Sequence, residues 1–295
     1  MKGSSHSMFS EKEQYSLMLY PAVLILAVIG VAPMIGMFFL SFVDFSLIEG
    51  QGEAFGLHNY SRMLVDERFI SSVVITLALT VFGLIFQLIL GIYIAIGLDK
   101  IIPDWKFLRG IFVVPLVVPA VAVALIWLTL FTPTLSPINA FFEIFGVEVP
   151  SFLTTKSGAI FAIVVADSWA SYPFVMLLIL AALQGIPSVL DEAAAIDGAT
   201  KIQIFFQITL PLLVPAILMI TLFRVIEMFK HFPLIYIMTN GGPGRSTQAT
   251  NYYAFIQTFQ STNVSYGASI AVFLFLFAAL ISFYAAKANE RVNDA

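Results

Sequence analysis

The chain has 295 residues, of which 60% are hydrophobic and only 11% are charged, and its mean hydropathy is +0.96. A water-soluble domain carries roughly 25% charged residues, so this composition excludes a soluble fold and predicts an integral membrane protein. The net charge of −4 comes without a basic cluster, which gives no support for nucleic-acid binding, and the absence of cysteine excludes disulfides and thiolate metal sites.

Six apolar stretches are long enough to cross a bilayer, which takes roughly 20 helical residues. Backbone groups in lipid must be satisfied within the segment, so we expect an all-α fold with about six transmembrane helices. The predicted spans are residues 17–42, 71–98, 108–131, 158–183, 209–230 and 266–286.

The pattern divides the chain into four parts. We expect residues 1–15 to hold a tag remnant and an N-terminal cytoplasmic segment, because the start resembles an expression remnant ahead of a native Met8. Residues 16–70 then form the first transmembrane helix and an outer loop, 71–288 form the core, and 289–295 form a cytoplasmic tail.

The orientation follows from the positive residues, which concentrate in cytoplasmic loops. With both termini inside, seven positive residues fall on the inner side and four on the outer side, where acidic residues accompany them. The four outer residues are Arg62, Arg68, Lys156 and Arg245. We therefore predict a multi-pass protein with both termini in the cytoplasm.

The fourth and fifth predicted spans carry ionisable side chains, which at membrane depth usually face a cavity or another chain. Arg224 and Glu227 are three residues apart, so they share a helix face and can pair. Hydrogen-bonding side chains beside aromatic ones are the mixture that a sugar site needs. The residues that supply it here are Asp167, Ser171, Tyr172, Phe174, Arg224 and Glu227. A purely structural role for the Arg224–Glu227 pair and for Asp167 remains open. Gln87 in the second span is expected to hydrogen-bond to another helix.

The loop at residues 186–211, between spans four and five, is predicted to form two short helices that meet at a turn. Ser188 is a candidate N-cap for the first helix, with Asp191 and Glu192 in its first turn. Gly198 is expected at the turn with a positive φ. Thr200 and Gln203 have the spacing of a capping box. A well-capped connecting loop is the simpler interpretation of the same residues.

The same loop resembles the signature loop of ABC-importer permeases. The matching residues are Glu192-Ala-Ala-Ala-Ile-Asp-Gly198-Ala199 and, after eight further residues, Ile208-Thr-Leu-Pro211. Trp169-Ala-Ser-Tyr-Pro-Phe174 and Thr239-Asn-Gly-Gly-Pro243 are similar to the carbohydrate-uptake branch, which includes the longer permease of the maltose transporter. The resemblance covers the chain from about Ser16.

The resemblance implies that this loop is a coupling helix that docks on a cytoplasmic ATPase. The residues expected to couple transport to the ATPase are Asp191, Glu192, Ala193, Ala194, Asp197, Gly198, Ala199 and Pro211. The implied partners are a second, similar permease, a dimer of ABC ATPases, an extracytoplasmic solute-binding protein and membrane lipid, in a bacterial or archaeal cytoplasmic membrane. ATP and Mg would be bound by the ATPase, since this chain has no Gly-x-x-x-x-Gly-Lys-Ser/Thr motif and no cofactor of its own is expected.

The resemblance also implies positions that contact substrate. They are Asp167, Ala170, Ser171, Phe174, Arg224 and Met228. Asp167, Arg224 and Met228 stand where the maltose permease has uncharged polar residues, which makes maltose itself doubtful and favours a charged or differently substituted ligand.

Two other function classes compete with an ABC permease. An ion-gradient-driven secondary transporter of a small polar solute would use Asp167, Arg224, Glu227 and Lys230 as coupling groups, but it needs inverted repeats, and the sequence offers no convincing internal symmetry. An intramembrane enzyme needs paired catalytic groups, and among the three histidines only His231 falls near a span. We therefore expect a non-catalytic subunit with no metal site.

Overall fold

The computed structural model describes residues 11–45, 55–100, 106–146, 151–228 and 231–293. Five helices are long and apolar enough to cross a membrane, and a sixth span is a bent pair of shorter helices. The five are Leu19–Ser41, Glu67–Asp99, Lys156–Gln184, Lys201–Glu227 and Val264–Tyr284. They coincide with five of the six predicted spans, so the all-α membrane fold is confirmed.

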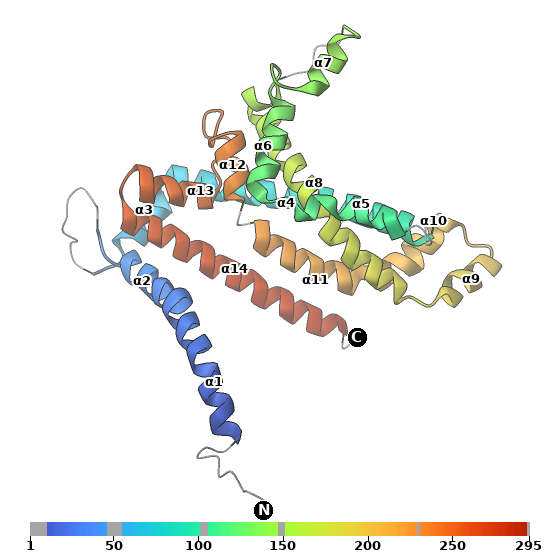
Figure 1. Ribbon diagram of the computed structural model, residues 1–295, viewed down its shortest axis with the longest axis horizontal. Coiled ribbons are helices and arrows are strands. Elements are labelled where there is room, and N and C mark those ends of the chain that lie inside the picture. The colour runs from blue at the N-terminus through green and yellow to red at the C-terminus, as the bar shows by residue number, and fades with distance from the viewer. Residues whose placement is uncertain (1–10, 46–54, 101–105, 147–150, 229–230, 294–295) are drawn as a thin grey trace, which may run out of the picture.

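The first span stands apart from the others. Helices α1 (Glu11–Leu26) and α2 (Ala32–Ser41) are joined by a π-helical turn at Ala27–Val31, and together they project from the body of the molecule (Figure 1). No residue from Leu19 to Leu40 is buried, although α2 contacts α14 (Val264–Asn293). An apolar arm that its own chain leaves largely exposed requires lipid or another subunit around it.

The core of the molecule is the contact between α4 (Glu67–Lys100) and α8 (Lys156–Gln184), the most extensive one between two helices. Gly91 makes it possible, because a Cβ at this position would lie 2.6 Å from Val175 Cγ1 and 3.0 Å from the backbone nitrogen of Met176. Val175, Met176 and Ile179 are fully buried beneath α4. Helix α11 (Leu210–Met228) packs on the same pair.

The third span is not the single helix that residues 108–131 were predicted to form. It consists of α5 (Lys106–Val117) and α6 (Ala120–Phe131), and the pair bends by 101°. Pro119 precedes α6 with an extended ψ of 143°, and proline has no N–H with which to continue a helix. The prediction was wrong because apolarity alone does not reveal a break inside an apolar run.

The fifth span begins earlier than predicted. Helix α10 (Lys201–Ile204) continues through a π-helical turn at Phe205–Thr209 into α11. The expected second short helix of the loop is therefore the start of the span itself. Both π-helical turns named so far end two residues before a proline, Pro33 and Pro211. A wider turn there relieves the clash between the proline ring and the carbonyl four residues earlier.

Apart from α9 (Ser188–Ile196), the remaining elements are short, and α7 among them projects away from the bundle (Figure 1). They are α3 (His58–Val65), α7 (Pro137–Glu143), the 3₁₀ turn Phe152–Thr154, α12 (Phe232–Met238), α13 (Thr250–Phe255) and the π-helical turn Ile256–Gln260. Asp66, between α3 and α4, accepts hydrogen bonds from the hydroxyls of Tyr253 and Tyr266, both at 2.6 Å. Burial opposes ionisation of Asp66, but these two hydroxyls and the backbone N–H groups of Arg68 and Phe69 outweigh it and lower its pKa.

Candidate functional site

A cavity of about 310 Å³ lies in the middle of the bundle, where two interrupted helices meet α8. The break between α5 and α6 supplies five of its lining residues, Pro115, Leu116, Val118, Ala120 and Val123. The start of α12 supplies His231, Pro233 and Leu234. Irregular backbone at membrane depth is tolerated where it lines a cavity or is covered by protein, so the 101° bend has a structural role in forming this wall.

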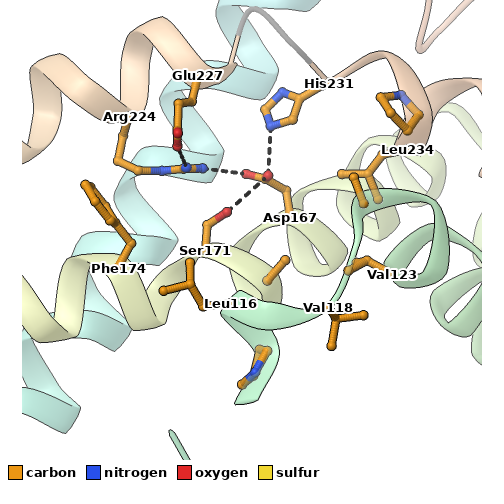
Figure 2. A pocket seen from close by; sticks show the side chains of 14 residues that line it. Leu116, Val118, Val123, Asp167, Ser171, Phe174, Arg224, Glu227, His231 and Leu234 are labelled. Atoms are coloured by element: carbon orange, nitrogen blue, oxygen red, sulfur yellow. Dashed lines mark hydrogen bonds and ion pairs between the residues drawn. The ribbon is translucent and has the colours of Figure 1, made fainter. Parts of the chain in front are cut away.

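Asp167 is the centre of the polar network in this cavity (Figure 2). Its Oδ1 accepts a hydrogen bond from His231 Nε2 at 2.8 Å, and its Oδ2 accepts one from Gln87 Nε2 at 2.5 Å. Ser171 Oγ lies one turn further along α8, 3.5 Å from Oδ1. One carboxylate thus ties α4, α8 and the start of α12 together.

Arg224 provides the positive charge. Its Nε donates to Gln87 Oε1 at 2.8 Å, its Nη2 lies 3.5 Å from Asp167 Oδ2, and its Nη1 pairs with Glu227 Oε2. The Arg224 side chain is 5% exposed, whereas that of Glu227 is 54% exposed. A buried charge is tolerated only when it is paired and hydrogen-bonded, and Arg224 meets that condition.

The structure brings together six of the eight residues predicted for the substrate path. Asp167, Ala170, Ser171, Phe174, Arg224 and Glu227 all line the cavity. Tyr172 does not line it, because it packs against the apolar cluster between α4 and α8. Met228 ends α11, and its side chain lies outside the described residues, as does all of Lys230.

The predicted contacts of Arg224 and Gln87 are confirmed, but the role of His231 was missed. Arg224 and Glu227 form the expected i, i+3 pair, and Gln87 makes the expected hydrogen bonds to another helix. His231 was considered only as a metal ligand or a catalytic residue. Its position two residues before Pro233, as the N-cap of α12, was the available signal that a helix starts there.

The loop after α8 has a different character. Helix α9 (Ser188–Ile196) contains no buried residue, and its exposed side chains include Val189, Glu192 and Ile196. Just beyond it, Ile202 and Phe206 are also exposed. A cavity of about 640 Å³ separates α9 from the last turns of α4, so α9 projects from the bundle at the end opposite α13 (Figure 1).

The local geometry of this loop follows two of three sequence predictions. Gly198 has φ +86°, and Thr200 and Gln203 form the predicted capping box. The prediction that Ser188 is an N-cap was wrong. Ser188 is already the first helical residue, Pro187 occupies the N-cap with ψ 127°, and no side chain caps the helix. Asp191 remains in the first turn.

Comparison with known proteins settles the family. Residues 87–293 match the model for the binding-protein-dependent transport system inner membrane component. The chain belongs to this family. It is a permease subunit of an ABC importer, which confirms the function predicted from the loop motif and leaves no need for an ion-gradient-driven mechanism.

Three similar relatives are permeases whose names refer to sugars or sugar derivatives. The trehalose/maltose transport system permease protein MalF of Thermococcus litoralis is 34% identical, over 90% of each chain. The multiple sugar-binding transport system permease protein MsmF of Streptococcus mutans is 31% identical, over 88% of this chain and 89% of its own length. The sulfoquinovosyl glycerol transport system permease protein SmoG of Agrobacterium fabrum is 33% identical, over 88% of this chain and 84% of its own.

The solved structures agree on the fold. A bacterial ABC transporter involved in the import of the acidic polysaccharide alginate contains a chain that superposes with a TM-score of 0.80 at 23% identity. The superposition covers 95% of this permease and 96% of that chain. The all-α arrangement is therefore the fold of a chain from an ABC transporter.

Proposed function

We propose that this permease carries a sugar or sugar-like solute through the cavity around Asp167, as half of a translocation pathway. The observation that carries the proposal is the composition of the cavity wall. Ser171, Glu227 and Asp167 offer hydrogen-bonding groups beside the apolar surfaces of Leu116 and Phe174, and sugars present hydroxyls at their rims and C–H groups on their faces. The names of the relatives, which refer to trehalose, maltose and other sugars, support the same substrate class.

The energy for transport arrives, in this proposal, through α9 as the coupling helix. The apolar side chains of Val189, Ile196 and Ile202 are between 62% and 86% exposed at the end of the bundle, and exposed apolar groups of this kind mark a partner surface. The partner is a dimer of ABC ATPases that binds ATP and Mg. Glu192 is the exposed carboxylate that meets its surface, and Gly198 sets the turn behind it.

The opposite end of the bundle faces outward and receives the solute-binding protein. A hollow of about 360 Å³ there is lined by the cations Arg68, Lys156 and Arg245 together with Glu67. Within the described residues these three cations form no ion pair. Acidic groups on a binding protein would complement them, and rim charges of this kind mainly speed association.

A second, similar permease completes the pathway, since this chain supplies only about six spans and leaves most of the arm α1–α2 exposed. Both termini lie in the cytoplasm in this proposal, as the distribution of positive residues predicts. The permease itself holds no catalytic group in this proposal.

The test is purification of the chain from its native host in a mild detergent, followed by mass spectrometry of the associated proteins. We expect an ATPase, a second permease and a binding protein. Reconstitution of that complex should then give ATP-dependent trehalose uptake that resists a protonophore. Recovery of the chain alone or as a homodimer, with uptake that the protonophore abolishes, would refute the proposal.

A further inference from the structure

The one cation among the described cavity-lining residues is already engaged. Each of the three guanidinium nitrogens of Arg224 has a protein partner, namely Gln87, Glu227 and Asp167. The side chain is almost fully buried. Withdrawing it toward a ligand would leave the Asp167 carboxylate uncompensated, which is the most destabilising way to disturb a buried ion pair. Arg224 is therefore a positioning residue, not an anion receptor.

The charged group that a ligand can reach is a carboxylate. Glu227 uses Oε2 for Arg224 and leaves half of its side chain exposed in the cavity wall, whereas the Asp167 side chain is only 10% exposed. Two carboxylates face one guanidinium here, and of the two it is Glu227 that is open to a ligand. Hydrogen bonds donated to a carboxylate are stronger than those between neutral groups, and like charges brought together in a poorly solvated site repel strongly.

We infer that Glu227 sets the charge preference of the pathway: it accepts a hydrogen bond from a hydroxyl or ammonium group of a neutral or amino-substituted sugar, and it disfavours sugar acids. The inference rests on the proposed function and deepens it. It is specific to this chain, because the similar fold of the alginate importer carries an acidic polysaccharide. Whether the transported solute is acidic or not is thus set by a few side chains in the cavity and not by the fold.

The experiment measures equilibrium competition against labelled trehalose on the purified transporter complex without its binding protein. The competitors are glucose, glucosamine and glucuronate, which share a ring and differ in one substituent. The variants are Glu227→Gln, which removes the charge and keeps the acceptor, Glu227→Asp, which keeps the charge, and Glu143→Gln, which removes an exposed carboxylate on α7 away from the cavity.

In the wild type we expect glucuronate to compete about tenfold more weakly than glucose, and glucosamine at least as well as glucose. Glu227→Gln should bring the three competitors to within about threefold of one another, whereas Glu227→Asp and Glu143→Gln should keep the wild-type order. Glucuronate competing as well as glucose in the wild type would overturn the inference, and so would an unchanged order in Glu227→Gln. Absence of trehalose binding in every variant would instead contradict the proposed function, and with it the inference.

Discussion

The surfaces of the cavity and of α9 each differ in polarity from their surroundings, and they differ in opposite directions. In the middle of an apolar bundle, Asp167 and Arg224 are charged, buried and fully hydrogen-bonded. At the end of the bundle, outside the apolar spans, α9 has no buried residue and exposes Ile196 almost completely. Each arrangement is costly for the chain alone. From this difference we infer that both regions are built for other molecules, the cavity for a polar ligand and α9 for an apolar protein surface.

The comparison is tested most strongly by removing the charge of Arg224. Arg224→Met should leave the Asp167 carboxylate buried without its cation, and the loss of one partner of a buried pair costs about 3–5 kcal/mol. We expect little folded protein in the membrane, measured by detergent-extractable yield and thermal unfolding. The double variant Asp167→Asn/Arg224→Met should recover part of this loss, and an Arg224→Met protein as stable as wild type would mean that the network is not structural.

The turn behind α9 should matter for transport and not for insertion. Gly198→Val places a β-branched residue at φ +86°, which costs about 1–2 kcal/mol of local strain and displaces α9. We expect transport to be abolished while the amount of protein in the membrane stays normal, measured by ATP-dependent uptake and immunoblotting. Gly198→Asn is the matched control, because asparagine tolerates this region, and it should retain transport. Wild-type uptake by Gly198→Val would remove the coupling role of the loop.

The capping box next to this turn gives a smaller, local effect. Thr200→Ala removes the hydroxyl that caps the fifth span, at a cost of about 1 kcal/mol. Hydrogen exchange measured by mass spectrometry should become faster in residues 201–204 and remain unchanged around the cavity. Equal acceleration in both regions would show that they are one cooperative unit.

The weakest expected effect concerns a third region, separate from the cavity and from α9. It is the pair of hydrogen bonds that Tyr253 and Tyr266 donate to Asp66. The folded state lowers the pKa of Asp66 below its ordinary value of about 3.9. These hydrogen bonds therefore stabilise the protein above that pH, and their contribution is lost as the pH falls through the lower, folded-state pKa. Thermal unfolding midpoints should therefore fall more between pH 6 and pH 3 in wild type than in Asp66→Asn. Identical pH profiles would exclude this contribution.

Local features were predictable from sequence, and contacts between distant residues were not. The spans, the Arg224–Glu227 pair, the φ of Gly198 and the Thr200 capping box all depend on residues within one or two helical turns. The bond between His231 and Asp167 joins segments far apart in the chain, and nothing in either segment specifies it. The break at Pro119 had a local signal, but prolines also occur inside the long helices, as Pro173 does in α8, so the signal did not decide between a kink and a break.

The close approach of α4 and α8 at Gly91 has a mechanical consequence. With 2.6 Å between a hypothetical Cβ and Val175, these two helices interlock and have no room to slide or rotate against each other. They form a fixed frame that carries Gln87 and Asp167. We therefore expect opening and closing of the cavity to come from the wall formed by α5 and α6, which meet at the 101° bend, moving against this frame.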